Sequence, residues 1–362
     1  MKTYMLNSAH IQSVDVRRIA AAKIAHTVRR VDQCAMTTLI TGDITPSSGD
    51  VVLARVIGLG HHKAVQGIGG RRLSLFVGDE IIVCYGDRYA PDQFEALVPE
   101  DLSVCHLVAG GGVASRSLSQ HSKLKGPTVI EPLGLLGDDS GRVINIRDWA
   151  LPSVTPTGPR PLTFAVVGTS MNAGKTTTAA YFIRGLVNSG MKVGAAKVTG
   201  TGAPRDTGLM IDAGATVALD FSDAGYPSTY RIGADEVQGI VDTLTNHLHA
   251  DGVDAIVLEV ADGLFQQETA ALLKSGVFQR NVDGVLFAAG DAMGASAGAD
   301  WLRQQALPVL ALSGCLSSSP LASAEAERVS GLPVLALEQL SADGILADIL
   351  EKPARNVVEL SA

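Results

Sequence analysis

The chain has 362 residues, of which 46% are hydrophobic and 18% charged, so it can form large cores and is not expected to be disordered. Its net charge of −8, without any basic run, argues against a nucleic-acid partner. No apolar segment is long enough for a membrane span, and the N-terminus MKTYMLNSAH lacks the apolar core of a signal peptide. We therefore expect a cytoplasmic protein.

The four cysteines are far apart in the sequence and form no CxxC pair; they are Cys34, Cys84, Cys105 and Cys315. This spacing argues against a disulfide framework or a zinc site. Because free cysteine is among the most buried residue types, we expect small buried thiols.

The N-terminal third divides into three segments of different pattern. Residues 12–32 carry apolar residues at helical spacing, which predicts a helical segment over residues 1–35. Residues 36–100 contain short β-branched runs separated by turn residues and are predicted to form a small β-barrel-like domain. The expected strands are Thr37–Thr41, Val51–Ile57, Arg72–Val77 and Glu80–Tyr85.

Residues 101–150 are predicted to be a mixed α/β segment. A strand over Val104–Val108 leads into the glycine-rich sequence 109–112, which either starts an anion-binding helix or makes a tight turn. Several basic side chains follow and either line a substrate pocket or form a solvated face; the set is His106, Arg116, His121, Lys123 and Lys125. Four prolines then mark residues 151–161 as a linker.

Residues 162–362 alternate between apolar strand patterns and helical patterns. Strands that are apolar throughout and separated by helices predict an α/β domain with a parallel sheet covered on both faces. The expected strands are 162–167, 191–197, 254–260, 283–289, 307–312 and 332–336. The expected helices are 175–189, 232–249, 268–275, 296–305, 320–329 and 338–351.

The first of these strands runs directly into a phosphate-binding P-loop followed by a helix. Backbone N–H groups of such a loop point at the phosphates of a nucleoside triphosphate. Lys175 would neutralise the β- and γ-phosphates, and the Thr176 hydroxyl would coordinate Mg²⁺. The nucleotide-binding residues are Gly168, Thr169, Ser170, Met171, Asn172, Ala173, Gly174, Lys175, Thr176 and Thr177. We expect Gly174 to be required because a side chain there would crowd the phosphates.

The loop departs from the usual pattern, since Thr169 stands where a glycine normally lies six positions before the lysine, and Gly168 is one position further back. This sequence, GTSMNAGKT, resembles the GTxxxxGKT loop of dethiobiotin synthetase. The resemblance assigns substrate or phosphate contact to Lys197 after the second strand, and Mg²⁺ binding to Asp206 and Glu259. The strand-end position of Glu259 independently favours a ligand role over helix capping. The resemblance to dethiobiotin synthetase also implies a dimer that completes the site.

A second resemblance is to a poorly characterised bacterial P-loop family implicated in N-acylation of D-glutamate. The shared features are the loop sequence Gly174-Lys-Thr-Thr-Thr-Ala179, the Thr199-Gly-Thr-Gly turn and the Asp220-Phe221 pair. Both resemblances cover about residues 162–290 and leave residues 36–100 unaccounted for. The residues Asn172-Ala173 and Val260-Ala261-Asp262 depart from these families, so the substrate is not carried over.

Other polar residues near strand ends have weaker assignments. Asp212 either binds near a metal ion or caps a helix. Judged by residue type alone, Asp206 has the same two interpretations. Asp220 either binds substrate or begins a turn, and Asp291 and Ser296 either approach a ligand or pack tightly.

Three functions follow from these patterns. The first is a ligase- or kinase-like enzyme that uses ATP and Mg²⁺ to activate a small carboxylic acid, amino acid or hydroxyl substrate, with Lys175, Lys197 and Glu259 as its catalytic residues. The second is a nucleotide-controlled switch or chaperone, which is disfavoured as a GTPase because the base motif NKxD is absent. The third is an acyltransferase that uses the P-loop to hold a coenzyme A-type cofactor.

Overall fold

The computed structural model describes residues 9–351 and divides the chain into two units. Unit 1 comprises the residues up to Pro152 together with Thr201–Arg205 and Phe221–Arg231. Unit 2 comprises Ser153–Gly200, Asp206–Asp220 and the residues from Ile232 onward. Each unit is described by itself below.

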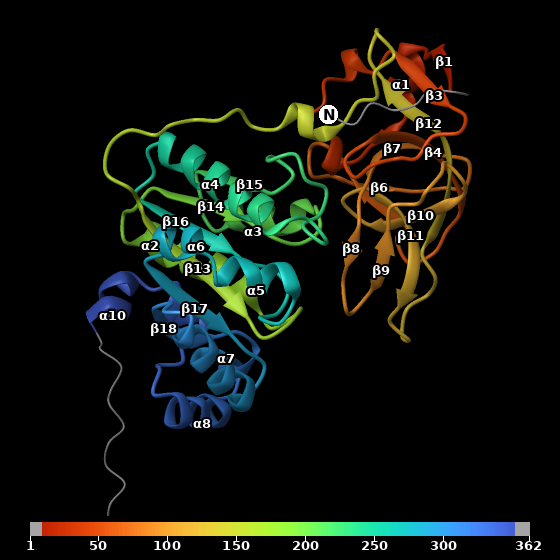
Figure 1. Ribbon diagram of the computed structural model, residues 1–362. Helices are drawn as coiled ribbons and strands as arrows, with labels where there is room; N and C mark the ends of the chain where they lie inside the picture. Colours follow the sequence, from red (N-terminus) through yellow and green to blue (C-terminus); the bar gives the residue numbers. More distant parts are fainter. Residues whose placement is uncertain (1–8, 352–362) are drawn as a thin grey trace, which may run out of the picture. The chain divides into compact units, whose positions relative to one another are not determined.

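Unit 1 is built on strands that pair mostly antiparallel (Figure 1). The main sheet has ten strands, and β5 and β6 form a separate pair. Within the main sheet, the pairings of β12, β4, β7, β11 and β10 form a closed circuit. The strands are β1 His10–Ser13, β2 Lys23–Ile24, β3 Thr38–Thr41, β4 Val51–Gly58, β5 Ala64–Gln66, β6 Arg72–Ser74, β7 Glu80–Tyr85, β8 Arg88–Tyr89, β9 Phe94–Leu97, β10 Cys105–Ala109, β11 Val113–Gln120 and β12 Thr128–Gly137.

The predicted helix over residues 12–32 is wrong for most of its length. Helix α1 covers only Val16–Ala21, with the Asp15 side chain accepting from the Arg17 N–H at its start. The chain then becomes extended, because Lys23 and Ile24 pair with β7 and form the two-residue strand β2. Two short 3₁₀ turns, η1 His26–Val28 and η2 Gln33–Ala35, complete the segment. Long-range strand pairing has therefore overridden the local helical pattern.

The expectation of mixed α/β structure in residues 101–150 is also wrong. This stretch holds three strands, β10 to β12, and one 3₁₀ turn, η3 Ile146–Trp149. The glycine-rich sequence turns tightly from β10 into β11, with Gly112 at φ +102°, so it starts no helix. The tight-turn interpretation is the one that the structure bears out.

Two segments assigned to the P-loop domain cluster instead with unit 1. The Gly202 N–H donates to the Pro227 carbonyl oxygen at 3.0 Å, so the two segments also contact each other. Arg29 lies 2.6 Å from the buried Asp223 carboxylate. These contacts explain why the chain re-enters unit 1 twice after residue 200.

Unit 2 has the predicted α/β architecture, with six parallel strands in the order β15-β14-β16-β13-β17-β18. The strands are β13 Leu162–Gly168, β14 Val193–Lys197, β15 Val217–Asp220, β16 Ala255–Glu259, β17 Gly284–Ala288 and β18 Val309–Ser313. The helices are α2 Lys175–Asn188, α3 Pro204–Asp212, α4 Ala234–Ala250, α5 Gln267–Leu273, α6 Gly276–Asn281, α7 Ala292–Gln304, α8 Pro320–Ser330, α9 Leu337–Leu340 and α10 Ile345–Glu351, with the 3₁₀ turn η4 Cys315–Ser318.

Several features of unit 2 differ from the pattern expected from the sequence. Strand β15 and helices α3 and α6 were not predicted, and the predicted helix 338–351 is divided into α9 and α10. Residues 332–336 form no strand, because only a single bridge joins Val334 to Leu312 of β18. The remaining five strands and most helices lie where the alternating pattern predicts them, within a few residues at their ends.

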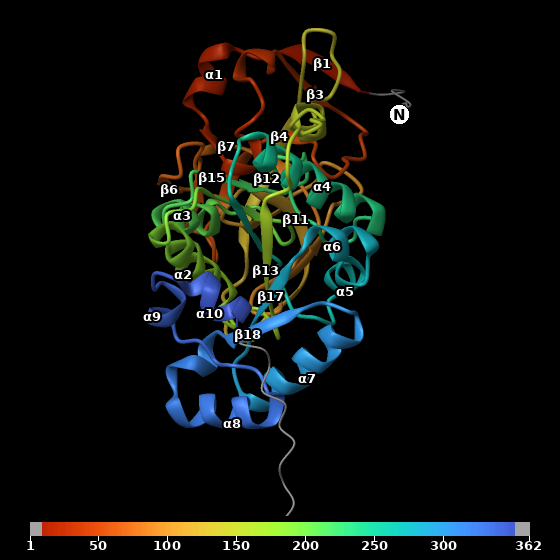
Figure 2. The ribbon, with the colours of Figure 1, turned by 90° about the vertical axis from the view of Figure 1, so that its left-hand side faces the viewer.

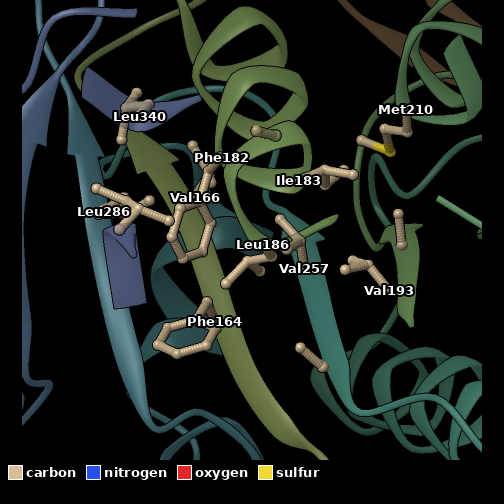
Figure 3. Close-up of a cluster of buried hydrophobic side chains, with 14 of the residues drawn as sticks. Phe164, Val166, Phe182, Ile183, Leu186, Val193, Met210, Val257, Leu286 and Leu340 are labelled. Carbon is tan, nitrogen blue, oxygen red and sulfur yellow. The ribbon is translucent and has the colours of Figure 1, made fainter. Parts of the chain in front are cut away.

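Helices cover both faces of the unit 2 sheet. In Figure 2, α2, α9 and α10 lie to one side of β13, β17 and β18, and α5, α6 and α7 lie to the other. The core under α2 is shown in Figure 3, where Phe182, Ile183 and Leu186 of α2 face Phe164 and Val166 of β13. The Phe164 and Phe182 rings meet edge to face with centroids 5.2 Å apart.

Burying an aromatic or aliphatic side chain of this kind stabilises a fold by about 1.5–3 kcal/mol. This core therefore fixes α2 against β13. The loop between them joins the end of the strand to the start of the helix. Among residues 9–351, no helix is both long enough and apolar enough to cross a bilayer.

Candidate functional site in unit 2

The loop that joins β13 to α2 has a backbone that only certain residues allow. Gly174 has φ +99° and Asn172 has φ +63°, both in the left-handed region. A Cβ on Gly174 would lie 2.8 Å from the Gly314 Cα, so this position excludes any side chain. The structure thus gives a different reason for Gly174 from the predicted one: its backbone angle and its contact with Gly314 require glycine without any phosphate present.

Gly168 explains the shifted glycine of the loop. A Cβ there would lie 2.8 Å from the Lys175 Cγ and 2.9 Å from the Ala288 carbonyl oxygen. The aliphatic part of Lys175 therefore runs directly over Gly168. The next residue, Thr169, needs no such close approach, and its N–H donates to the Ala288 carbonyl oxygen at 3.0 Å.

The N-terminus of α2 has no side-chain cap, since Gly174 occupies the cap position. Side chains normally satisfy some of the free N–H groups at a helix start. Here the N–H groups and the positive end of the helix dipole are left facing the loop. A helix start of this kind, reached through a glycine-rich turn, suits a phosphate group.

Lys175 is buried, with only 6% of its surface exposed. Its Nζ donates to the Ser170 carbonyl oxygen at 2.7 Å, so the ammonium lies across the loop. Burial lowers the pKa of Lys175, while the negative charges of Glu259 and Asp262 act in the opposite direction. A phosphate would supply further negative charge beside this ammonium.

Thr176 and Glu259 are in direct contact. The Thr176 hydroxyl donates to the Glu259 Oε1 at 2.8 Å, and Glu259 is 2% exposed. Its other oxygen, Oε2, is buried and has no hydrogen-bond partner among the described residues. Burial raises the pKa of Glu259, and the positive charge of Lys197 partly opposes this shift.

A buried carboxylate oxygen without a partner is costly unless something binds it. Residues 9–351 contain no group of three or more His, Cys, Asp or Glu side chains that could hold a metal ion. Mg²⁺, however, is commonly held by one or two carboxylates or hydroxyls together with phosphate oxygens and water. Thr176 and Glu259 fit that arrangement.

Lys197 lies at the end of β14, beside Glu259 at the end of β16, and the two are paired in register. Its Nζ forms an ion pair with Asp206 of α3. Burial lowers the pKa of Lys197, but the charges of Asp206 and Glu259 outweigh that effect and raise it overall. Lys197 is thus a buried, charged residue at the strand ends and not a surface charge.

Two other predicted residues, Asp291 and Asp212, lie at the ends of helices. Asp291 caps α7 by accepting from the Gly294 N–H at 2.8 Å, and Asp212 is exposed at the end of α3. Asp220 is buried at the end of β15, next to Lys197 in register.

The structure also brings residues to the loop that the sequence interpretation missed. The Cys315 N–H donates to the Ala173 carbonyl oxygen at 3.0 Å, and Asp262 has φ +64° and acts on the pKa of Lys175. The available signal was the polar Ser313-Gly-Cys sequence at the end of a predicted strand. The expectation of buried thiols holds for Cys84 and Cys105 but is wrong for Cys34 and Cys315, which are exposed.

No protein-family model matches the chain, and no curated protein matches it by sequence. Several solved structures resemble it at low identity. The Signal Recognition Particle 54 kDa protein from Aeropyrum pernix K1, in complex with GDP, is 19% identical, with 54% of this chain and 49% of that chain covered and a TM-score of 0.36.

A DUF1611 family protein from Anabaena variabilis is 14% identical, with coverage of 59% and 65% and a TM-score of 0.40. The kinase domain of the Escherichia coli tyrosine kinase ETK is 14% identical, with coverage of 42% and 66% and a TM-score of 0.33. The chain spans about half of the first of these structures and less than two thirds of the other two. These similarities concern the α/β fold alone.

Proposed function

We propose that unit 2 binds a nucleoside triphosphate with Mg²⁺ and transfers its terminal phosphoryl group to a small-molecule carboxylate or hydroxyl. The observation that carries this proposal is the Thr176–Glu259 contact with its unpartnered Oε2, directly beside the uncapped start of α2. A phosphate at the helix start and a cation at Glu259 together meet both requirements.

The roles of the protein groups follow from their positions. The loop and the first turn of α2 would hold the phosphates through N–H groups, and Lys175 would balance their charge. Thr176 and Glu259 would hold Mg²⁺, which when bound neutralises charge that develops on the phosphate oxygens. Lys197 would face the acceptor side of the phosphoryl group, with Asp206 keeping its ammonium in place.

The acceptor oxygen would attack the γ-phosphorus while the bond to the β–γ bridging oxygen breaks, and the nucleoside diphosphate leaves with that electron pair. A carboxylate acceptor has no proton to lose and needs no general base. Because Asp206 is paired with Lys197 and Glu259 with Thr176, the cluster favours a carboxylate over a hydroxyl acceptor. ATP is the proposed donor, since the GTP-specific NKxD motif is absent from the sequence.

Calorimetric titration of ATP, GTP and coenzyme A, with and without Mg²⁺, tests the ligand. Turnover of the nucleotide that binds is then measured against a panel of small carboxylic and amino acids. We expect Mg²⁺-dependent ATP binding and turnover that rises sharply with one class of acid. Coenzyme A binding without nucleotide consumption would contradict phosphoryl transfer and support an acyltransferase, and slow turnover indifferent to every acid would support a switch.

The resemblance to dethiobiotin synthetase further implies a dimer, and the sequence pattern a cytoplasmic location. Both stay predictions.

A further inference from the structure

The first residue of η4, Cys315, holds the loop between β13 and α2 through two hydrogen bonds. Its N–H donates to the Ala173 carbonyl oxygen at 3.0 Å, and its thiol Sγ donates to the Asn172 carbonyl oxygen at 3.2 Å. One residue from beyond β18 thus binds two successive carbonyl groups of the loop. The inference drawn from these contacts rests on the nucleotide-binding function proposed above.

The two hydrogen bonds fix the direction of two peptide planes. In a trans peptide, the carbonyl group and the following N–H point in opposite directions, and none of the described peptide bonds is cis. Because the Ala173 carbonyl faces Cys315, the Gly174 N–H points away from η4, and it has no acceptor within residues 9–351. The Asn172 carbonyl directs the Ala173 N–H away from η4 in the same way.

The side of the loop to which these N–H groups point is the side of the Lys175 ammonium. The Ala173 N–H donates to the Ser170 carbonyl oxygen at 3.3 Å, and the Lys175 Nζ donates to the same oxygen at 2.7 Å. The shared acceptor places the N–H and the ammonium together. Cys315 therefore holds the carbonyls on one side of the loop, while the groups that suit a phosphate lie on the other.

The segment that carries Cys315 is itself anchored to the sheet. The N–H of the buried Leu316 donates to the Ala289 carbonyl oxygen at 3.0 Å, and the Ala289 N–H donates to the Ser313 carbonyl oxygen at 2.9 Å. Gly314 has φ +91°, and a Cβ there would lie 2.3 Å from the Ala173 carbonyl oxygen. The close approach to the loop thus needs glycine, and the two donors of Cys315 are fixed relative to the ends of β17 and β18.

The Asn172 carbonyl needs a partner of this kind because Asn172 has an unfavourable backbone conformation. Its φ of +63° lies in the left-handed region, which residues other than glycine adopt uncommonly. Relaxation to an ordinary φ would rotate the peptide plane that joins Asn172 to Ala173. The Ala173 N–H would then turn away from the Lys175 side. A donor on the Asn172 carbonyl opposes this rotation.

We propose that Cys315 is a positioning residue of the nucleotide site. It acts through the loop, by holding the Asn172 and Ala173 carbonyls outward so that the N–H groups of Ala173 and Gly174 face the phosphates. A thiol is a weak hydrogen-bond donor, so the backbone N–H of Cys315 contributes the larger part of the effect. Nucleotide affinity should depend on Cys315, whereas the phosphoryl-transfer step should not.

Three substitutions separate the two donors of Cys315. Serine keeps both donors, alanine keeps only the N–H, and proline, which is tolerated at the first position of a helical turn, removes both. Calorimetry with ATP and Mg²⁺ should give an affinity within about twofold of the unaltered chain for Cys315→Ser, about threefold to tenfold weaker for Cys315→Ala, and about tenfold to 100-fold weaker for Cys315→Pro. The kcat at saturating ATP should stay nearly constant in the serine and alanine variants.

The matched control is Cys34→Ala, at the exposed free cysteine of unit 1. It should bind ATP normally. If Cys315→Pro fails to fold, the alanine and serine variants decide the question, because they retain the backbone.

NMR of the ligand-free chain tests the peptide plane directly. Asn172–Ala173 is the only Asn–Ala pair in the sequence, so ¹³C in the asparagine carbonyl and ¹⁵N in alanine together select a single correlation signal. This signal should move in Cys315→Ala, return toward its original position in Cys315→Ser and stay unmoved in Cys34→Ala.

The outcomes separate this inference from the function on which it rests. Unchanged ATP affinity in the alanine and proline variants, or an unmoved Asn172–Ala173 signal in Cys315→Ala, would overturn the positioning role while leaving nucleotide binding in place. A loss of affinity that serine does not restore, matched by an equal loss of thermal stability, would also overturn it. Absence of ATP binding in the unaltered chain would instead refute the proposed function, and the inference with it.

Discussion

The two units place their chemically active residues in opposite ways. In unit 2, Lys197 and Glu259 lie at the ends of parallel strands, and Lys175 and Thr176 come from one continuous stretch, Gly168–Thr178. In unit 1, His61 and His62 of the turn after β4 contact the Phe94 ring of β9, and the two segments meet only because the antiparallel strands pair. A site carried by one loop leaves a signature in the sequence, whereas a cluster assembled by strand pairing does not. The predictions below test whether nucleotide chemistry belongs to unit 2 alone.

The largest effect is expected for Lys175→Ala. It removes a buried ammonium from the proposed phosphate site, so ATP affinity should fall by about 100-fold or more. The fold should persist, because a buried charge is itself costly to keep. Calorimetry measures the affinity. Lys192→Ala in unit 2 and Lys123→Ala in unit 1, both exposed lysines, are the controls. ATP affinity unchanged in the Lys175 variant would refute the site assignment.

Glu259→Gln should reduce Mg²⁺-dependent turnover by about 10–100-fold while weakening nucleotide binding much less. The amide retains the size of the side chain and its contact with Thr176 but cannot supply a negative ligand. Turnover measured across a range of Mg²⁺ concentrations checks this, with the exposed Glu100→Gln of unit 1 as the control. Equal turnover in both variants would remove Glu259 from the metal site.

Gly174→Ala should lower both nucleotide affinity and stability, the former by about tenfold. Its φ of +99° strains an alanine by about 1–2 kcal/mol, and the new Cβ would press on Gly314. Gly70→Ala in unit 1 is a matched control, because Gly70 has φ +75° with open space around its Cβ position. Thermal unfolding should show a drop in both variants, and nucleotide titration a loss only in Gly174→Ala. A normal affinity in Gly174→Ala would mean that the loop geometry is not needed.

Asp206→Asn should have a smaller effect, about threefold to fivefold on turnover, because it loosens Lys197 without removing it. The exposed Asp212→Asn, in the same helix, is the control. Steady-state kinetics should show a change in kcat with little change in the Mg²⁺ requirement. A large shift in the Mg²⁺ requirement would instead place Asp206 among the metal ligands.

The smallest effect is expected for His62→Gln, in the pH dependence of stability. Burial lowers the pKa of His62 in the folded state from 6.5 to about 3. Its neutral form therefore stabilises the fold above pH 6.5, and that contribution is lost as the pH falls from 6.5 toward 3. Between pH 7 and pH 5, the free energy of unfolding should fall by about 0.5–1 kcal/mol less in the variant than in the unaltered chain. Urea unfolding at the two pH values measures this difference. Parallel pH profiles would show that His62 does not titrate in this way.

The sequence predicts unit 2 well because its elements are locally encoded. The run from Leu162 to Thr178 contains a strand, a turn and a helix start in order, and the strand-end position of Glu259 follows from the alternating pattern. Strand β15 was missed because Val217–Asp220 is short and only partly buried. The contact of Gly314 with Gly174 joins residues far apart in the chain and has no local signal.

Unit 1 could be predicted only in part. Its β-rich character is visible in runs such as Val51–Gly58, but residues 12–32 have a helical pattern that pairing with β7 overrides. His61 and His62 next to a short strand look like any polar turn. Their contact with Phe94 depends on the strand pairing of unit 1, which the sequence does not specify.

The way in which unit 1 recruits Thr201–Arg205 and Phe221–Arg231 has a practical consequence for dissecting the protein. The proline-rich stretch before β13 is an obvious place to truncate the chain for separate expression. A fragment that ends there would lack Asp223, the buried carboxylate beside Arg29, and the hydrogen bond from the Leu151 N–H to the Asp223 carbonyl oxygen. Cutting at the linker would thus remove part of unit 1 together with unit 2. The two units therefore cannot be separated intact by a single cut in the chain.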